Sequence, residues 1–576
     1  MHVGLVGDGP AAAAARDAVA PVADSVTSLD PGAVGNVDLA IAVGAVGEGP
    51  FLAVNDRARA TGMPWLAVEV GGIGDHAVKG LDAAVSGFTP GEGCFDCLAT
   101  RVAANDDGDG TNRSNAETTE ADARFAGALA GREAVRLLRG QPSPVLGGVV
   151  EVPHAQRRFL PVPGCNCGGT RSRELDQSHE PREIDAALGA AERALDPRVG
   201  VVSEVGEVES FPAPYYLATL ADTTDFSDAR ASPKAAGVAA GWDTAFMKAL
   251  GEGLERYAAG VYRAAEFDRS PPAETPDGIS PTRFVRPDSF EGGDADDPIR
   301  WAVGEHLPTG SRVKLPAEFV VFPPPTVRHR PAITTGLGLG NGGIEALLSG
   351  LYEVVERDAA MLAWYSTFEP LGLDVADDRY RELADRARAE GLEATALLLT
   401  GDVDVPVVAA CLHRDSGSWP RFAAGMAADL DPQAAAADAL EEAVQNWLEL
   451  RGMGREEANA ESGAVGSYAE FPPAARTFVD PESTVPAASV GPDESFDGEA
   501  ELDALVARVT EAGLDPYAAR LTPRDLDALG FEAVRVLVPS AQPLFTDEAY
   551  FGERAKRVPR ELGFEPRLDR DHHPFP

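Results

Sequence analysis

The sequence predicts an α/β protein made of two units, and three observations lead to this prediction. Its 576 residues exceed what one hydrophobic core usually holds, since cores rarely grow beyond about 300 residues. The chain opens with a strand, a glycine-rich turn and an alanine-rich helix, as a doubly wound sheet does. The second half carries three helical segments with paired acidic or amide side chains, separated by apolar strands.

The first unit is expected to cover residues 1–170. A strand at 2–6 runs into Gly7-Asp-Gly9-Pro-Ala-Ala12, whose G-x-G-x-x-A spacing permits a nucleotide site. Pro10 occupies the helix start, however, and the nearby acidic residue, Asp30, falls in a turn. We therefore interpret the unit as a Rossmann-like scaffold and not as an active nucleotide site. Further elements are predicted as strands at 37–43 and 64–70, an exposed loop at 105–120 and a helix at 121–139.

Four of the five cysteines form two close pairs at the two ends of the block 94–167. The pairs, Cys94-Phe-Asp-Cys97 and Cys165-Asn-Cys167, both lie in turns rich in glycine and proline. Four thiolates suit tetrahedral Zn²⁺, so the pattern predicts a structural zinc knuckle. The single spacer residue of the second pair is shorter than usual and leaves lost zinc or a redox pair open. The fifth, Cys411, lies in an apolar strand at 405–412 and is expected to be buried.

Residues 171–196 are polar and are predicted to connect the first unit to a second one at 197–576. The central feature of this second unit is the turn Gly338-Leu-Gly-Asn341-Gly-Gly, followed by Glu345, Glu353, Glu356 and Arg357. At about 100° per residue, the three glutamates fall on one side of a single helix. Three carboxylates on one stripe repel one another unless a cation lies among them. Mg²⁺ shared with phosphates supplies that charge.

The motif E-x-x-E-R occurs twice in this unit. Glu252-Gly-Leu-Glu255-Arg256 repeats the pattern of 353–357, and Glu442-Ala-Val-Gln445 is a weaker third version. A spacing of three places the two oxygen-bearing side chains next to each other on a helix. One copy alone would be interpreted as a solvated helix face with local Glu–Arg pairs. The repetition favours a shared site.

Other parts of the second unit are predicted from their composition. A strand is expected at 312–322, and two acidic stretches rich in proline and glycine, 268–299 and 455–500, are interpreted as surface insertions. Trp242, Trp364 and Trp447 are expected in the core.

The net charge of −42 is spread along the whole chain, which contains only five lysines. This pattern suggests a protein of a high-salt cytoplasm, because concentrated salt screens the repulsion among carboxylates. The alternative is an acidic protein that binds basic partners. The acidic surface argues against nucleic acid as a ligand. No apolar run reaches the roughly 20 residues of a membrane span and no signal peptide is visible, so we expect a cytoplasmic protein without membrane association.

Taken together, these residues resemble the YcaO family. The Gly-Asn turn followed by Glu345, Glu353, Glu356 and Arg357 fits the family signature, while 252–256 is similar to its first ATP motif and 442–445 to its third. The ending His573-Pro-Phe-Pro576 resembles the C-terminus of members that act on peptides. The N-terminal half looks like the ThiF-like, zinc-bearing domain fused ahead of YcaO in SagD-like azoline cyclodehydratases of bacteriocin biosynthesis. The resemblance implies a Rossmann-like domain with a zinc knuckle, followed by an α+β YcaO domain.

The resemblance also implies an enzyme that uses ATP and Mg²⁺ to activate backbone amides of a peptide or protein substrate. A Cys, Ser or Thr side chain of the substrate, or an external sulfide, attacks the amide carbon. The oxyanion takes the γ-phosphoryl group, and loss of phosphate gives an azoline or a thioamide. Mg²⁺ would be held by Glu252, Glu255, Glu345, Glu353 and Glu356, the nucleotide by Asn341, Glu442 and Gln445, and zinc by Cys94, Cys97, Cys165 and Cys167. Arg256 and Arg357 would touch phosphate or brace the carboxylates, and the Pro576 carboxylate would act as a base or orienting group.

The chain departs from the family pattern at a few positions. Lys248 and Gly338 stand where serine is common, and Ser349 where glutamine is frequent. No winged-helix leader-binding segment precedes the first strand, so a separate leader-binding or TfuA-like partner is expected, together with a homodimer. Two other functions remain open: an inactive scaffold that docks a partner cyclodehydratase, and an NAD or nucleotidyl enzyme built around Gly7 and Gly9. The intact acidic set argues against a pure scaffold, because buried carboxylates are costly without a use.

Overall fold

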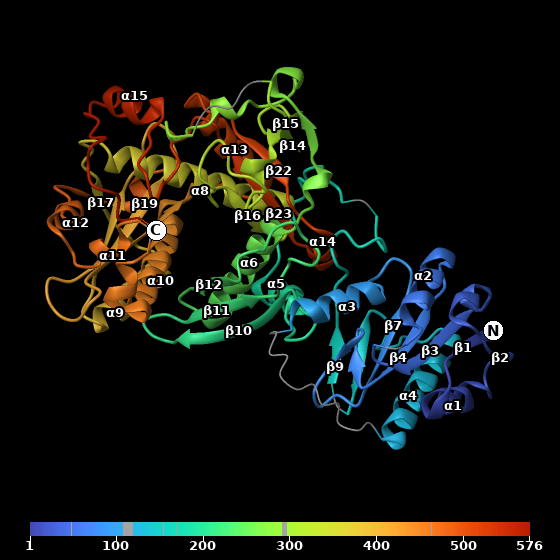
Figure 1. The fold of residues 1–576 in the computed structure, drawn as a ribbon. Helices are drawn as coiled ribbons and strands as arrows, with labels where there is room; N and C mark the ends of the chain where they lie inside the picture. The colour runs from blue at the N-terminus through green and yellow to red at the C-terminus, as the bar shows by residue number, and fades with distance from the viewer. Residues whose placement is uncertain are drawn as a thin grey trace.

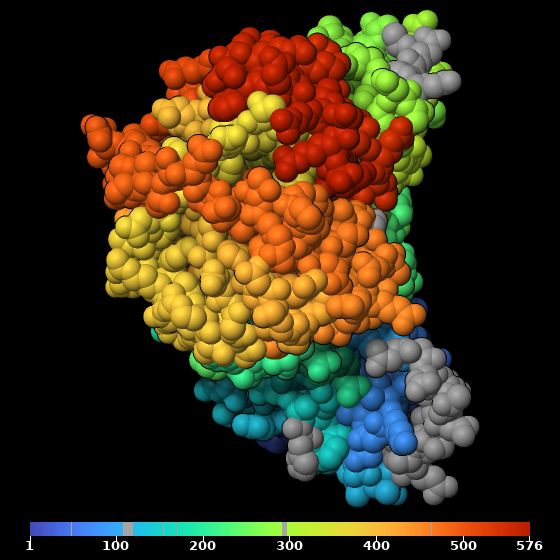
Figure 2. Space-filling model, turned by 90° about the vertical axis from the view of Figure 1, so that its left-hand side faces the viewer, coloured from blue at the N-terminus to red at the C-terminus, as the bar shows by residue number. Residues whose placement is uncertain are grey.

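A computed structural model describes residues 1–47, 49–106, 119–153, 155–169, 171–290, 296–461 and 463–575 (Figure 1). Pro576 and most of the predicted loop at 105–120 lie outside these residues. In Figure 1 the N-terminal sheet and its helices lie to one side of a larger group of sheets and helices. Figure 2 shows the yellow-to-red C-terminal residues over the upper part of one face and the blue N-terminal residues at its lower end.

The N-terminal unit is a seven-stranded sheet in the order β2-β1-β3-β4-β7-β8-β9. The strands are β1 (His2–Val6), β2 (Ser25–Ser28), β3 (Leu39–Ala45), β4 (Trp65–Val70), β7 (Ala83–Phe88), β8 (Gly148–Val152) and β9 (Ala155–Arg158). The first four pair in parallel and the remaining pairs are antiparallel. A short hairpin, β5 (Gly72–Ile73) and β6 (His76–Ala77), follows β4. The strands predicted near 2–6, 37–43 and 64–70 are therefore present.

Helices cover both faces of this sheet, as in doubly wound folds. They are α1 (Gly9–Val19), α2 (Phe51–Thr61), α3 (Phe95–Ala104) and α4 (Glu120–Leu138). Along β3, Leu39 and Ile41 pack with α1 and α4, whereas Ala40 and Ala42 face the cluster that contains α2 and α3. The turn after β1 requires glycine, because a Cβ at Gly7 (φ +94°) would lie 2.2 Å from the Val43 carbonyl oxygen.

Three further sheets form the second unit, and each supports one long helix. They run β10-β11-β12, β13-β14-β22-β23-β16 with β15 beside β14, and β20-β19-β18-β17-β21. Helix α6 (Trp242–Gly260) packs on the first, α8 (Gly343–Trp364) on β16 and β23 of the second, and α10 (Pro432–Ala458) on β19 and β20 of the third. The strands are β10 (Val202–Glu209), β11 (Tyr215–Leu220), β12 (Lys234–Val238), β13 (Asp268–Ser270), β14 (Ile299–His306), β15 (Ser311–Pro316), β16 (Leu337–Gly340), β17 (Leu371–Asp374), β18 (Glu393–Leu398), β19 (Val407–His413), β20 (Phe422–Ala428), β21 (Thr484–Pro486), β22 (Tyr517–Arg520) and β23 (Glu532–Leu537).

Smaller helices complete the unit, and three sequence predictions need correction. These helices are α5 (Ile184–Ala191), α7 (Ala317–Val320), α9 (Asp378–Ala389), α11 (Val465–Tyr468), α12 (Pro473–Phe478), α13 (Gly498–Glu511), α14 (Arg524–Leu529) and α15 (Glu553–Glu561). The strand predicted at 312–322 ends at Pro316, where α7 begins. The stretch 455–500 is more than a surface insertion, because its strand β21 pairs in parallel with β17. Trp242 is 48% exposed at the first residue of α6, whereas Trp364 and Trp447 are buried as predicted.

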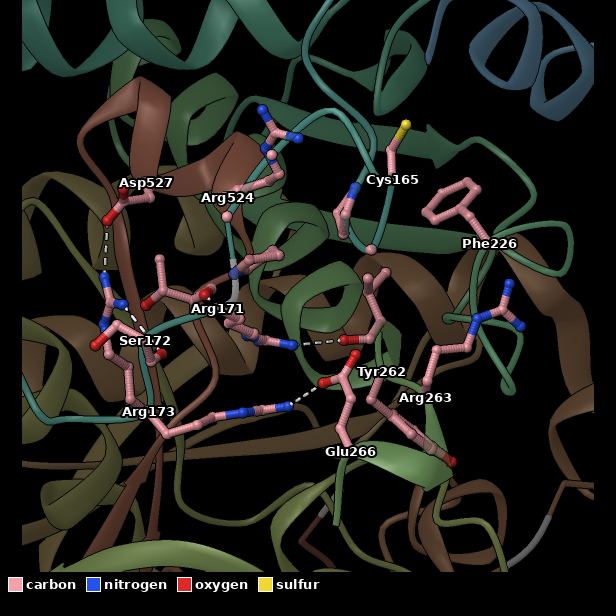
Figure 3. A pocket seen from close by; sticks show the side chains of 18 of the residues that line it. Cys165, Arg171, Ser172, Arg173, Phe226, Tyr262, Arg263, Glu266, Arg524 and Asp527 are labelled. Atoms are coloured by element: carbon pink, nitrogen blue, oxygen red, sulfur yellow. Dashed lines mark hydrogen bonds and ion pairs between the residues drawn. The ribbon is translucent and has the colours of Figure 1, made fainter. Parts of the chain in front are cut away.

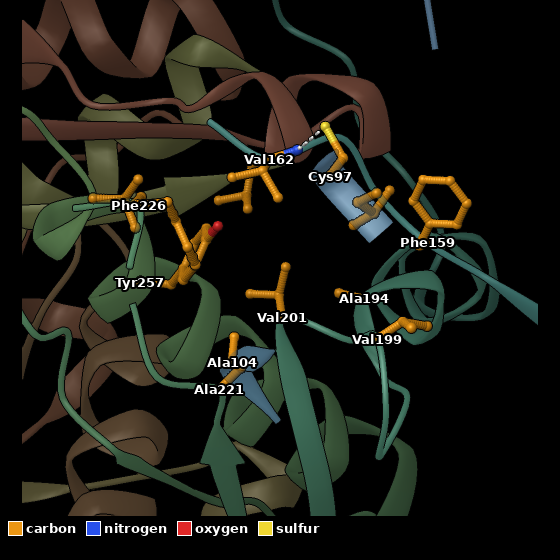
Figure 4. Close-up of a cluster of buried hydrophobic side chains, with 14 of the residues drawn as sticks. Cys97, Ala104, Phe159, Val162, Ala194, Val199, Val201, Ala221, Phe226 and Tyr257 are labelled. Carbon is orange, nitrogen blue, oxygen red and sulfur yellow. Dashed lines mark hydrogen bonds between the residues drawn. The ribbon is translucent and has the colours of Figure 1, made fainter. Parts of the chain in front are cut away.

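The two units share one continuous hydrophobic core. Figure 4 shows Cys97 and Phe159 of the N-terminal unit in the same buried cluster as Val201, Phe226 and Tyr257 of the second unit. None of the helices in the described ranges is long and apolar enough to cross a membrane.

A buried polar cluster crosses the same junction. The Tyr257 hydroxyl of α6 donates to Asp525 Oδ2 of α14 at 2.6 Å, and Arg101 Nη1 of α3 donates to the Tyr257 oxygen at 3.2 Å. Arg101 and Asp525 also form an ion pair in which neither side chain is exposed. Elements far apart in the sequence are thereby held together by charge that water cannot screen.

Candidate active site

The acidic motif on α6 is arranged around Arg256. Its Nε donates to Glu252 Oε1 at 2.8 Å, and its Nη1 lies 4.0 Å from Glu255 Oε1. Although Nη1 is buried, it forms no hydrogen bond with a described residue. Arg256 therefore braces the two carboxylates and keeps one donor unused.

Arg357 has the equivalent position on α8 and also joins that helix to α10. Its Nε lies 3.3 Å from Glu356 Oε1 and 3.9 Å from Glu353 Oε1, and its Nη2 lies 3.8 Å from Glu442 Oε1 of α10. Glu353 accepts a second interaction, a hydrogen bond of 2.9 Å from the Gly336 backbone N–H. The structure thus brings the E-x-x-E-R motif of α8 and the third motif into contact.

The electrostatic environment connects the carboxylates of all three helices. Burial raises the pKa of Glu255 to about 8, and the charges of Glu252 and Glu353 add to the rise while Arg256 opposes it. Burial likewise raises the pKa of Glu356 to about 8, with Arg357 opposing and Glu442 and Glu353 adding. Glu353 of α8 also raises the pKa of Glu442 on α10, so its charge acts on carboxyl groups of both neighbouring helices. The site contains more carboxyl groups than arginines.

This donor set fits a magnesium ion that carries phosphates. Glu356 Oε1 is buried, lies 3.3 Å from Arg357 Nε and accepts no hydrogen bond from a described residue, so it is available as an oxygen ligand. The carboxylate oxygens are not gathered around one point: in the described part of the chain, only the cysteine group has all its ligand atoms within 4.8 Å of one another. Such spacing is expected where Mg²⁺ is held by one or two carboxylates together with substrate phosphates.

Glu345 and Asn341 lie apart from this centre. Glu345 is exposed, and Asn341 donates to its Oε2 from both the backbone N–H and Nδ2 at 3.0 Å. Eight helical residues, or about 12 Å along the axis, separate Glu345 from Glu353. On α10, Gln445 Nε2 donates to Glu449 Oε1 at 3.1 Å. The ligand roles of Asn341, Glu345 and Gln445 remain predictions.

Two further charged residues belong to the site. Burial raises the pKa of Glu449, which lies one turn after Gln445, and the charges of Glu442 and Glu252 add to the rise. Arg535 of β23 is buried, and burial lowers its pKa to about 9 while Glu353 and Glu255 oppose the change. The i+4 spacing from Gln445 to Glu449 was a usable signal in the sequence. Arg535 gave no such signal, because its neighbours in the strand, Ala533, Val534, Val536 and Leu537, are apolar and belong to no motif.

The departures from the family pattern also have structural explanations. Lys248 forms an ion pair with Glu441 and lies 3.9 Å from Asp438, so it links α6 to α10. A Cβ on Gly338 would lie 2.2 Å from the Ala346 carbonyl oxygen, so β16 and α8 pack too closely here for serine.

Pro576 lies outside the described residues, but the tail before it is placed near Arg357. His573 and Phe575 are buried, and His573 Nε2 donates to the Phe545 carbonyl oxygen at 2.7 Å. Burial lowers the pKa of His573 to about 4, and the charge of Arg357 contributes to this.

The four paired cysteines form a second, separate cluster at the start of α3. Their sulfur atoms lie 3.6 Å apart for Cys94–Cys165, 3.4 Å for Cys97–Cys167 and 3.9 Å for Cys94–Cys97. Tetrahedral zinc with Zn–S bonds of about 2.3 Å needs sulfur atoms about 3.8 Å apart. Hydrogen bonds among the four thiols lower the pKa of Cys167 and raise those of Cys94 and Cys97, so the fit to a metal ion rests on the sulfur–sulfur distances. The residues fit a structural zinc ion.

A family model described as YcaO cyclodehydratase, ATP- and Mg²⁺-binding, matches residues 236–542, which is more than half of the chain. The chain belongs to the YcaO family. It is an ATP-dependent enzyme of this type, and α6, α8 and α10 all lie within the matched region.

Two relatives of this YcaO protein are described only as uncharacterized. One, from Methanothermobacter thermautotrophicus, is 29% identical over 319 residues, which are 54% of this chain and 81% of the relative. The other, encoded in the tfuA 3′ region of Rhizobium leguminosarum bv. trifolii, is 31% identical over 168 residues, which are 26% of this chain and 39% of the relative.

Solved structures resemble the YcaO protein over nearly its whole length. A heterocyclase in complex with substrate and cofactor aligns with a TM-score of 0.76 at 21% identity, covering 100% of this chain and 85% of its own. The heterocyclase TruD aligns with a TM-score of 0.67 at 20% identity, covering 98% and 82%. Both share the fold, which confirms the predicted α/β class for the two units together.

Proposed function

We propose that this YcaO enzyme uses ATP to phosphorylate backbone amides of a ribosomally made peptide or protein, giving an azoline or a thioamide. The observation that supports this most strongly is that partly buried carboxylates of α6 are braced by Arg256, while those of α8 and α10 are braced by Arg357, and that they raise one another's pKa. Phosphoryl transfer requires positioning and charge stabilisation more than a protein nucleophile. Carboxylates braced by guanidinium groups are suited to that task.

The proposed roles follow from the contacts of each side chain. Glu252, Glu255, Glu353 and Glu356 would hold Mg²⁺, with one or two of these carboxylates on each ion together with phosphate oxygens. ATP with Mg²⁺ would supply the phosphoryl group that turns the amide oxygen into a leaving group. Arg256 and Arg357 would fix the carboxylates and contact phosphate. Asn341, Glu345, Glu442 and Gln445 would line the nucleotide pocket, and the Pro576 carboxylate would orient the attacking group or accept its proton.

The remaining parts of the chain would support this reaction. We assign residues 1–170 to a ThiF-like scaffold with structural zinc at the four cysteines, 171–196 to a connection and 197–576 to the catalytic unit. Presentation of the peptide by a separate leader-binding or TfuA-like protein is supported by the relative encoded beside tfuA. We expect the working enzyme to be a homodimer.

ATP hydrolysis by the purified chain in concentrated KCl tests this proposal. The double variant Glu353→Gln/Glu356→Gln should lose at least about 100-fold in rate, because it removes charge that the transition state needs. A matched control is Glu382→Gln/Asp385→Asn, which changes two exposed acidic residues at the same spacing on α9 and should stay within twofold. Hydrolysis by the site variant at the wild-type rate would refute the assignment, and a wild-type chain that neither binds nor hydrolyses ATP would favour the scaffold alternative.

The product is identified by mass spectrometry of a peptide substrate. Loss of one water per modified residue indicates an azoline, whereas exchange of one oxygen for sulfur in the presence of sulfide indicates a thioamide.

A further inference from the structure

We propose that the junction between the two units contains a second site, which binds a small molecule carrying a carboxylate or phosphate group. A cavity of about 730 Å³ lies there, between residues 163–169 and 171–173 around the second cysteine pair, the residues that follow α6 at 261–266, and the segment 520–527 (Figure 3). Cavities of a few hundred Å³ accommodate small-molecule ligands.

The cavity collects positive charge in a chain whose net charge is −42. Five arginines line it, against two acidic side chains, Glu266 and Asp527. The arginines are Arg171, Arg173, Arg263, Arg520 and Arg524. Three of the five are neutralised by ion pairs of 2.7 to 2.9 Å with Glu266, Asp228 and Asp527. The other two, Arg171 and Arg524, have no such partner among the residues that the structure describes.

Arg171 is held in place without a counter-ion. Its Nε donates to the Thr522 carbonyl oxygen at 3.0 Å and its Nη1 to the Val261 carbonyl oxygen at 2.9 Å. Its Nη2 is buried and forms no hydrogen bond, and no carboxylate among the described residues lies within 4.0 Å of the guanidinium. The guanidinium lines the cavity and is not neutralised by any carboxylate of the described residues, so an anion in the cavity would supply the missing counter-charge.

Arg524 adds a second guanidinium without a carboxylate. Its Nη1 donates to Cys167 Sγ at 3.3 Å, which leaves its other nitrogens for a ligand. Close packing fixes this side chain, because a Cβ at Gly168 would lie 2.1 Å from Arg524 Nη1. Phe226 and Tyr262 provide apolar walls in the same cavity. An organic acid or a phosphate ester, with one anionic group and a carbon skeleton, matches these surroundings.

Equilibrium dialysis of the full-length, zinc-loaded protein tests the proposal. Labelled inorganic phosphate and labelled citrate are the probes, at constant ionic strength, with the ATP site filled by Mg²⁺ and a non-hydrolysable ATP analogue. We expect at least one probe to bind, with at least tenfold weaker binding in Arg171→Gln. The control Arg312→Gln removes an exposed arginine outside the cavity and should bind within twofold of wild type.

The outcomes are distinguishable. Binding of phosphate alone points to a phosphate-bearing ligand, and binding of citrate alone to a carboxylate. If Arg171→Gln does not fold, Arg524→Gln replaces it, with zinc content measured in the same sample. Failure of both probes to bind wild type, or equal binding to wild type and the cavity variant, would overturn the proposal. Because the ATP site is filled throughout, the result does not depend on the proposed function.

Discussion

Asparagine at position 525 would leave Arg101 charged and buried without its counter-ion. Both side chains are fully buried, and the Tyr257 hydroxyl also donates to Asp525 Oδ2 at 2.6 Å. Removing one partner of a buried pair typically costs about 3–5 kcal/mol, because the other charge remains desolvated. The carbonyl oxygens of Leu160 and Pro161, which accept from Arg101 at 3.3 and 3.2 Å, provide only partial compensation. We expect Asp525→Asn to lower the free energy of unfolding by about 3 kcal/mol or more.

The matched control is Asp515→Asn, ten residues earlier in the chain. Asp515 pairs with Arg283 at 2.7 Å, but the two side chains are 49% and 44% exposed. Exposed pairs contribute about 1 kcal/mol or less and are weakened by salt. Both variants are compared with wild type by urea unfolding followed by tryptophan fluorescence, at two concentrations of KCl.

The expected difference is large enough to measure. With a urea slope of about 1–3 kcal/mol per molar, Asp525→Asn should lower the midpoint by on the order of 1 M or more, and Asp515→Asn by only a few tenths. The effect of Asp525→Asn should persist at high KCl. A double variant, Arg101→Leu/Asp525→Leu, should recover much of the loss because it buries no charge. Equal midpoints for the two single variants would refute the reasoning.

Three further predictions concern other parts of the molecule. Gly338→Ser should lower the free energy of unfolding in urea by about 1–3 kcal/mol, because the new Cβ would lie 2.2 Å from the Ala346 carbonyl oxygen. The control Gly206→Ser should be tolerated, because a Cβ at Gly206 would have no atom within 4 Å. Burial lowers the pKa of His573 from 6.5 to about 4, so the free energy of unfolding should fall as the pH drops from 6.5 toward 4. His573→Phe should remove about 3 kcal/mol of this pH dependence at pH 4, whereas the control His572→Gln should leave it unchanged. Cys94→Ser/Cys97→Ser should abolish the bound zinc measured by atomic absorption, and Cys411→Ala should retain it; unchanged zinc in the double variant would contradict the site.

Local periodicity accounts for the parts of the site that were predictable. The E-x-x-E-R spacing is a property of one helix, so it places Glu353, Glu356 and Arg357 together before any tertiary structure is known. The contact between Arg357 and Glu442 joins residues 85 positions apart, and only the packing of α8 and α10 creates it. Helical periodicity also predicts on which face of a helix a side chain lies, but not how far along the axis it is from another side chain on that face. Glu345 shares a face with Glu353, yet lies about 12 Å along the axis.

Burial cannot be predicted from residue type alone when a residue lies at the end of a helix or strand. Trp242 was expected in the core because of its size, but it is the first residue of α6, where the side chain reaches Glu207 at the surface. Arg101 and Asp525 show the opposite case, in which charged residues are buried. Each is a charged residue on a short helix, where residue type alone predicts exposure, and both are fully buried. Burial of a charge is decided by what packs against its helix.

The sign of the charge at each site is therefore set by tertiary structure and not by composition. A chain with a net charge of −42 still surrounds its motif carboxylates with Arg256, Arg357 and Arg535, and lines its junction cavity with five arginines. Concentrated salt screens exposed carboxylates within a few ångströms but has little effect on groups that water cannot reach. Salt should therefore control the stability of the surface, while the geometry of the two arginine-centred sites stays the same once the chain is folded. We therefore expect the ATP hydrolysis rate to change with salt concentration only as far as the folded fraction of the protein changes. Among samples that are fully folded, the rate should not depend on salt concentration.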